Sequence, residues 1–163
     1  MSKIDKIDLE IVNLLMEDGR MPASEIARRI AISERVVRYR IDRLVKEKMI
    51  TISAISHPQA FGFNVNADVF VEVEPAQIRD VAEKLAQQDC VAYVAFSIGE
   101  RDVSVQVVAR DNSEMYDFAT QVIGKLPGVR KTITYIVPTV LKDVYQWRVP
   151  LSSCEDNQSE NPS

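Results

Sequence analysis

Residues 22–48 constrain the fold of this chain more than any other stretch. Their sequence is PASEIARRIAISERVVRYRIDRLVKEK, and it holds two short amphipathic helical patterns on either side of Ala31-Ile32-Ser33. Apolar residues recur every three or four positions in both patterns, and the second is rich in arginine. This outline is typical of a helix-turn-helix, in which the second helix enters the major groove of DNA.

The rest of the N-terminal third predicts one earlier helix and one later strand. A helix over 5–17 carries a broad apolar stripe and is expected to end near Gly19, which can take a positive φ. Ser33 suits the N-cap of the arginine-rich helix. Residues 49–56, MITISAIS, alternate between apolar and polar side chains and predict a strand, the wing beside the helix-turn-helix.

The charge distribution favours DNA as a partner, although the whole chain has a net charge of −4. Residues 28–48 contain eight basic and three acidic residues. Phosphate attraction acts over a Debye length of about 8 Å at physiological salt, so a local basic face outweighs the overall sum. Arg35, Arg38 and Tyr39 are candidates for base or sugar contacts, with Arg38 suited to a guanine edge.

The other candidates for the DNA interface, of which the basic ones are expected at phosphates, are Ser33, Glu34, Arg28, Arg29, Arg40, Arg43 and Lys46. The alternative for all of them is a solvated charged face on an ordinary helix.

A different pattern follows from residue 66 onward. Strands are predicted over 66–74, 91–98, 103–109 and 129–137, with helices over 75–88 and 113–124. This β-α-β-β-α-β order is the ferredoxin-like unit, in which both helices cover one face of the sheet. Val69, Val71 and Val73 alternate with Phe70, so a second copy of the chain is expected on the other face, giving a homodimer. Residues 140–148 are expected to add a short edge strand.

The predicted fold class is therefore α+β, with a winged helix-turn-helix and a ferredoxin-like ligand and oligomerisation domain. The expected organisation is a DNA-binding domain over 1–57, a linker over 58–65, the ligand domain over 66–148 and a disordered acidic tail over 149–163. No signal peptide or membrane span is apparent, so we expect a cytoplasmic protein with no membrane partner.

Metal and covalent chemistry have little support in the sequence. Cys90 and Cys154 lie far apart and do not have zinc-site spacing, and His57 is the only histidine. One histidine cannot build a metal site or a catalytic pair without partners. We therefore expect no metal, no cofactor and no catalytic residue.

Several short motifs, taken in order, resemble one family. They are Ile7-Asp8, Asp18-Gly19-Arg20, Glu25-Ile26-Ala27, Ser33 to Leu44, His57-Pro58-x-x-Phe61-Gly62, Gly99-x-x-Asp102 and Leu126-Pro127-Gly128-Val129. Over about residues 4–147 the chain resembles the Lrp/AsnC (leucine-responsive/asparagine-responsive, "feast-famine") transcription regulators.

The resemblance implies dimers that assemble into tetramers, octamers or larger discs on pseudo-palindromic operators. It also implies that a small molecule, usually an amino acid, binds between ligand domains near the loop from Gly99 through Glu100 and Arg101 to Asp102. In that pocket the aspartate can pair with the effector's ammonium. Thr132, Thr134 and Thr139 are further candidates. The alternatives are that Asp102 satisfies its own hairpin backbone and that the threonines are simply strand formers.

Two residues depart from the family pattern. Ala31 stands where a glycine is usual, which is tolerable if the turn avoids a positive φ. Arg101 stands where many members carry an aromatic residue, so the pocket edge is charged. An acidic or polar amino acid, or no effector at all, is then favoured over a leucine-type effector.

Two other functions remain to be weighed. An effector-independent or architectural DNA-binding protein of the same fold would bind broadly and with steep salt dependence. Tetrapyrrole-decarboxylating enzymes also resemble this family, but they need histidine and arginine around a large pocket and have usually lost the arginine-rich helix. One histidine and a retained arginine-rich helix argue against an enzyme.

Overall fold

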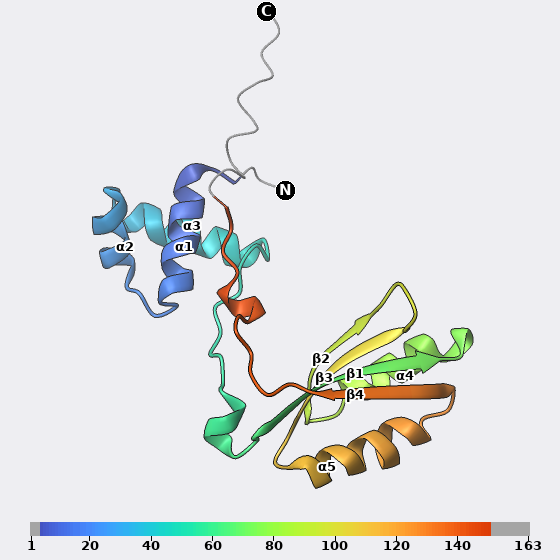
Figure 1. Cartoon of the computed structure of the whole chain (residues 1–163). Coiled ribbons are helices and arrows are strands. Elements are labelled where there is room, and N and C mark those ends of the chain that lie inside the picture. The colour runs from blue at the N-terminus through green and yellow to red at the C-terminus, as the bar shows by residue number, and fades with distance from the viewer. Residues whose placement is uncertain (1–3, 151–163) are drawn as a thin grey trace, which may run out of the picture. The chain divides into compact units, whose positions relative to one another are not determined.

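The computed structural model describes residues 4–150, and the predicted acidic tail lies almost entirely outside them. The described residues divide into two units: residues 4–55 together with 142–150, and residues 56–141 (Figure 1). The expected linker begins close to this boundary, and residues 142–150 group with the N-terminal unit. None of the helices in the described chain has the length and apolar character needed to cross a bilayer.

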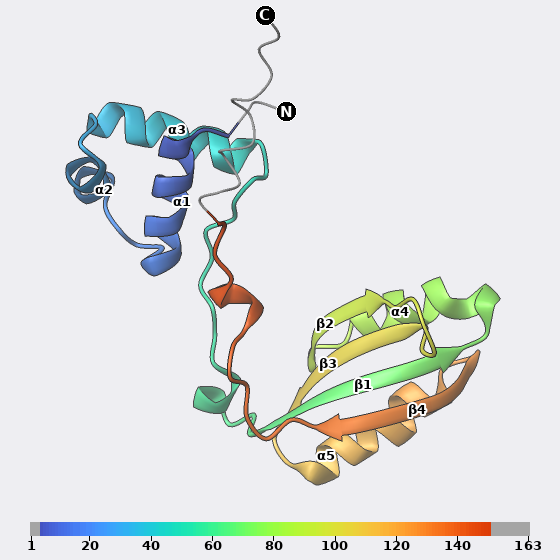
Figure 2. The ribbon, with the colours of Figure 1, turned by 45° about the horizontal axis from the view of Figure 1, so that its top comes forward.

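Three helices build the N-terminal unit: α1 (Lys6–Glu17), α2 (Ala23–Ile30) and α3 (Glu34–Lys46) (Figure 2). Ile11, Ile26, Ala27 and Val37 form their common core. The predicted N-cap of α3 is confirmed, because the Ser33 hydroxyl accepts a hydrogen bond from the Val36 N–H at 3.3 Å. These contacts define a helix-turn-helix with α3 as its second helix.

The turn between α2 and α3 places Ala31 in the left-handed region, with φ 55°. The condition under which alanine would be tolerated here without strain, a turn that avoids a positive φ, is therefore not met. A residue with a Cβ is disfavoured there by about 1–2 kcal/mol, which explains why glycine is the usual choice. Gly19 does not have the positive φ that was considered for it. Helix α1 is capped one residue earlier, at Asp18, whose backbone is extended with φ −145°.

The two strands predicted outside the main sheet do not form. Met49 and Ile50 donate their N–H groups to the Leu44 carbonyl, so the chain bends across the end of α3. Residues 51–56 then continue without strand pairing in the described part of the chain, because alternation makes a strand only where a partner strand lies alongside.

Residues 140–148 are likewise irregular apart from a short 3-10 turn at Val144–Gln146, which Asp143 caps. Figures 1 and 2 show this segment running beside the chain that follows α3. Arg148 Nη1 lies 3.2 Å from Glu17 Oε1 and so fixes it to α1.

The second unit is the predicted β-α-β-β-α-β fold. Its strands are β1 (Val65–Val73), β2 (Val91–Phe96), β3 (Val103–Ala109) and β4 (Val129–Ile136), joined in the antiparallel order β2-β3-β1-β4. The helices are α4 (Ile78–Ala86), which follows a 3-10 turn at Pro75–Gln77, and α5 (Asn112–Asp117). Helix α5 continues through a π-helical turn at Phe118–Val122 and a 3-10 turn at Ile123–Lys125.

Alternation along β1 separates a buried face from an open one, as predicted. Val69, Val71 and Val73 pack with residues of α4 and α5, including Val81, Leu85 and Met115. Figures 1 and 2 show both helices on this face. On the other face the Phe70 and Tyr135 rings pack in a T-shaped arrangement with their centroids 6.0 Å apart, and Tyr93 and Tyr135 are 52% and 57% exposed.

Gly128 precedes β4 with φ +88°, and a Cβ at this position would lie 2.5 Å from Gln77 Cβ. Gly128→Ala should therefore lower the free energy of unfolding by about 2–4 kcal/mol, the sum of backbone strain and overpacking. Urea unfolding followed by far-UV circular dichroism measures the loss. Gly62 provides the control, since its φ is +86° but nothing lies within 4 Å of its Cβ position. Gly62→Ala should cost only about 1 kcal/mol, and equal losses for the two variants would contradict the packing argument.

Candidate nucleic-acid interface and effector loop

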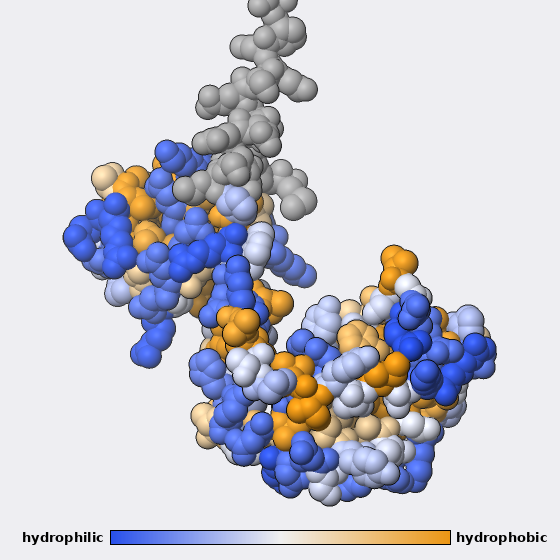
Figure 3. Space-filling model, viewed as in Figure 1, coloured by the Kyte–Doolittle hydropathy of each residue, from blue (hydrophilic) through white to orange (hydrophobic). Residues whose placement is uncertain are grey.

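Helix α3 presents one face to solvent while its other face holds it on the domain. Val37 and Leu44 are fully buried, and Arg35, Arg38 and Tyr39 are exposed, Tyr39 to 68%. Val36 and Val45 are also exposed, to 39% and 43%. Hydrophilic side chains cover most of the visible surface of this unit (Figure 3).

Two of the exposed α3 arginines differ in their surroundings. Glu34 Oε1 accepts hydrogen bonds from Arg38 Nε at 2.9 Å and from Arg38 Nη2 at 2.5 Å. The Arg38 side chain nevertheless remains 67% exposed. Arg35 makes no ion pair with any of residues 4–150, so its whole guanidinium is available to solvent or to a phosphate.

The two α2 arginines share the carboxylate of Glu25. Arg28 Nη2 lies 2.7 Å and Arg29 Nε 2.8 Å from Glu25 Oε1, and the arginine side chains stay 73% and 43% exposed. Hydrogen bonds from Arg28 first, and then from Arg29, lower the pKa of Glu25 to about 2. The α2 arginines thus remain at the surface in a charged cluster with Glu25, whose carboxylate is ionised at neutral pH.

Arg40 and Arg43 do not belong to the exposed face. Arg40 Nη1 lies 2.8 Å from Asp8 Oδ1 and 2.7 Å from Asp5 Oδ2, and Arg43 Nη2 bonds the other oxygen of Asp8. Asp8 is fully buried, and the two arginine side chains are only 18% and 22% exposed. Their predicted phosphate contacts are therefore not supported: both arginines act inside the domain and fix α3 to α1.

This buried cluster also affects the carboxylate at its edge. Partial burial is the largest single influence on the pKa of Asp5 and raises it, but the hydrogen bonds from Arg40 and from Asp8 together with the Arg40 charge outweigh burial, and the pKa is lowered overall. The same bond raises the pKa of Arg40. The role of Asp8 was not predicted from the sequence. The one indication of it in the sequence was a carboxylate within the apolar stripe of the first helix.

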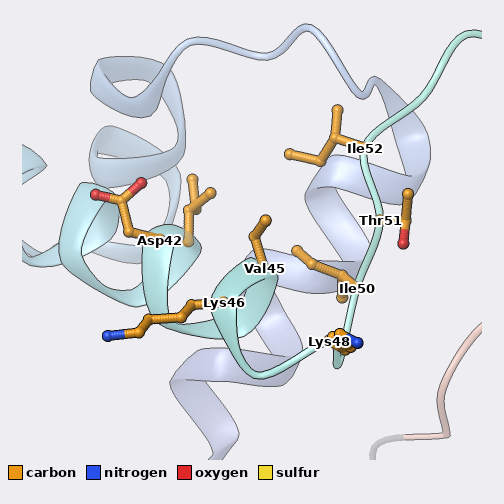
Figure 4. A pocket seen from close by; sticks show the side chains of 8 residues that line it. Asp42, Val45, Lys46, Lys48, Ile50, Thr51 and Ile52 are labelled. Carbon is orange, nitrogen blue, oxygen red and sulfur yellow. The ribbon is translucent and has the colours of Figure 1, made fainter.

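An open, largely apolar hollow of about 510 Å³ lies at the C-terminal end of α3 (Figure 4). Ile41 and Val45 of the helix face Ile50 and Ile52 of the following chain, while Lys46 and Lys48 stand at its rim. The predicted phosphate contact Lys46 is exposed here and forms no ion pair within residues 4–150.

The loop at residues 99–102 is tied to the sheet. Val73 donates its N–H to Asp102 Oδ2 at 2.8 Å, and the Asp102 N–H bonds the Val71 carbonyl at 3.0 Å. Asp102 therefore serves the backbone of β1, at the point where its pairing with β4 shifts register, and not only its own hairpin. Gly99 has φ +149°, and Arg101 Nη1 lies 3.3 Å from Glu72 Oε2.

The three candidate threonines do not join this loop in one site. Thr132 and Thr134 pair with Val71 and Val69, so they lie on the helix-facing side of the sheet. Thr139 is exposed and follows Ile136, the end of β4 farthest from Asp102. Of the three threonines, only Thr132 lies near the loop within one chain, because it pairs with Val71, whose carbonyl accepts the Asp102 N–H.

Comparison with known proteins agrees with this architecture of a helix-turn-helix unit and a separate α+β unit. Residues 4–45 match the AsnC-type helix-turn-helix domain, and residues 66–147 match the Lrp/AsnC ligand binding domain. The chain belongs to the Lrp/AsnC family of transcription regulators. This family membership confirms the resemblance drawn from the motifs and identifies a regulator, not an enzyme.

Individual relatives extend over nearly the whole chain. An uncharacterized HTH-type transcriptional regulator of Pyrococcus abyssi is 38% identical over 141 residues, covering 86% of this chain and 89% of the relative. HTH-type transcriptional regulator LrpA of Pyrococcus horikoshii is 32% identical over 140 residues, covering 85% and 99%.

Solved structures share the fold at lower identity. E. coli AsnC has a TM-score of 0.80 at 20% identity, covering 88% of this chain and 99% of AsnC. A transcriptional regulator from Neisseria meningitidis, solved as an L-Met complex, has a TM-score of 0.85 at 22% identity, covering 93% and 99%.

Removing the buried carboxylate tests the cluster beneath α3. Asp8→Asn removes the buried counter-charge of Arg43 and one of the two carboxylates that pair with Arg40, and it should lower the free energy of unfolding by about 3 kcal/mol. Urea unfolding by circular dichroism measures it. In the control Asp5→Asn, the half-exposed Asp5 should contribute under about 1 kcal/mol, and asparagine retains the N-cap. A loss below 1 kcal/mol for Asp8→Asn would show that the cluster does not hold α3 in place.

Proposed function

We propose that this protein is a sequence-specific DNA-binding transcription regulator whose DNA binding is modulated by a small molecule. The observation that carries the proposal is the outward face of α3. Arg35, Arg38 and Tyr39 are exposed together there, while Arg40 and Arg43 are partly buried and pair with Asp8 of α1. A helix that packs on the domain with one face can present its opposite, exposed face to the major groove, which is about 12 Å wide.

In this proposal Arg38 and Tyr39 contact bases, while Arg35, Arg28, Arg29 and Lys46 contact phosphates. Ser33 and Glu34 stand at the N-terminal end of α3, the end that contacts base edges in helix-turn-helix proteins. The proposed assembly is a homodimer formed through the open sheet face, and its two copies of α3 would bind half-sites one helical turn apart, about 34 Å, on a pseudo-palindromic operator. Higher assembly to tetramers or octamers follows the family, and the cell compartment is the cytoplasm.

The proposed effector is an amino acid bound between ligand domains. The L-Met complex of the Neisseria regulator supports this class of ligand. Here the loop carries Glu100, Arg101 and Asp102 beside Glu72, so an acidic or polar amino acid suits it better than an aliphatic one. Binding would act by changing subunit assembly or the spacing of the two α3 helices.

A second candidate is an effector-independent or architectural DNA-binding protein. One observation favours it: Asp102 Oδ2 already accepts the Val73 N–H, and Arg101 already pairs with Glu72. An effector ammonium at Asp102 would share the carboxylate that already accepts a hydrogen bond from the Val73 N–H of β1.

Arg38→Ala tests the DNA contact. It should weaken binding to a selected operator about tenfold or more, since a good bidentate base contact is worth roughly 1–3 kcal/mol. Binding to mixed-sequence DNA should fall much less. Fluorescence anisotropy with both duplexes measures the two affinities, and Arg79→Ala on α4 is the charge-matched control. Equal losses on both duplexes would make Arg38 a phosphate contact.

Light scattering during titration with the twenty amino acids, with operator retention followed in parallel, tests the effector. We expect one polar or acidic amino acid to change the mass of the assembly or its affinity for DNA. If DNA is bound but no amino acid changes either quantity, the architectural candidate replaces the regulated one.

A further inference from the structure

The contact between Glu34 and Arg38 leaves the arginine in a particular orientation. Glu34 Oε1 accepts from Nε at 2.9 Å and from Nη2 at 2.5 Å, so the carboxylate binds one side of the guanidinium. Arginine carries five N–H donors in a planar fork. The side-on contact uses two of them and leaves the two N–H groups of Nη1 and the second N–H of Nη2.

These remaining donors form the end of the fork, and guanine accepts such a fork at O6 and N7 in the major groove. The carboxylate therefore orients the guanidinium without occupying the donors that a guanine needs. Arg38 remains 67% exposed in this orientation, so the end of the fork is accessible.

The position of Glu34 makes an incidental surface pair a poor explanation. A carboxylate on a DNA-facing helix repels the phosphate backbone, which supplies much of the affinity of any DNA-binding protein. Arg35, the next residue, forms no ion pair within residues 4–150 and is free to meet a phosphate. The same helix thus presents one arginine without an ion-pair partner among residues 4–150 and one arginine whose guanidinium is hydrogen-bonded to a carboxylate.

We propose that Glu34 is a specificity-determining positioning residue, which holds the Arg38 guanidinium end-outward to contact a guanine. This inference rests on the proposed DNA-binding function and names the residue pair that selects a base. Ordering a long side chain in advance reduces the conformational entropy lost on binding. Binding to guanine therefore becomes more favourable, while binding to the other bases does not.

The test uses the full chain and duplexes selected from a randomised pool. Wild type, Arg38→Ala, Glu34→Gln and the double variant are compared by anisotropy on the selected site and on sites carrying each other base at every position. Arg38→Ala should abolish guanine preference at one position. Glu34→Gln should lower that same preference about three- to tenfold while leaving or raising affinity for mixed-sequence DNA, because it removes one negative charge.

Glu25→Gln is the matched control. Glu25 also pairs with exposed arginines, Arg28 and Arg29, but it lies on α2. Its variant should change affinity for mixed-sequence DNA in the same direction as Glu34→Gln and leave the guanine preference unchanged. In the Arg38→Ala background, Glu34→Gln should have no further effect on base preference, as a positioning role requires.

The inference is overturned if Glu34→Gln leaves the guanine preference intact, if Glu25→Gln lowers it equally, or if the selected site holds no guanine that depends on Arg38. These outcomes leave the proposed DNA-binding function standing. A wild-type protein that enriches no site from the pool instead overturns the proposed sequence-specific function, and the role of Glu34 with it.

Discussion

The buried carboxylate of Asp8 is the interaction on which the DNA-binding unit depends. A charge removed from water must find opposite charge and hydrogen bonds, and Asp8 finds both in Arg40 and Arg43. These two side chains lie one turn apart on α3, so the pairing sets both the rotation of α3 about its axis and its position along α1. The apolar contacts of Val37 and Leu44 hold the helix in place, whereas the ion cluster decides which residues it turns outward.

In the second unit a hydrogen-bonded loop has the corresponding role. Asp102 joins the β2–β3 hairpin to β1 through the Val73 N–H, and Arg101 joins it to Glu72. A ligand that arrives at this loop meets side chains that already have partners. Under the proposed function, the binding energy of an effector at this loop would be the difference between two sets of contacts, which favours a modest affinity.

Hydrophobic periodicity predicted the three N-terminal helices and the four sheet strands, because both elements bury one face and the spacing of apolar residues records that face. It failed at residues 49–56, where alternation has no partner strand. The pattern did not reveal that Arg40 and Arg43 pair with Asp5 and Asp8, because these partners lie over 30 residues away and charge pairing across that separation depends on how the helices pack. A count of basic residues cannot distinguish an arginine that binds phosphate from one that neutralises a buried acid.

The C-terminal segment of the N-terminal unit has a consequence for modular exchange. Residues 142–150 group with the helix-turn-helix, and Arg148 pairs with Glu17 at the end of α1. The unit is therefore assembled from two separate stretches of chain, with residues 56–141 between them. A chimaera that grafts this operator preference onto another ligand domain would need to carry both stretches, and a graft of residues 1–55 alone would leave Glu17 without that partner.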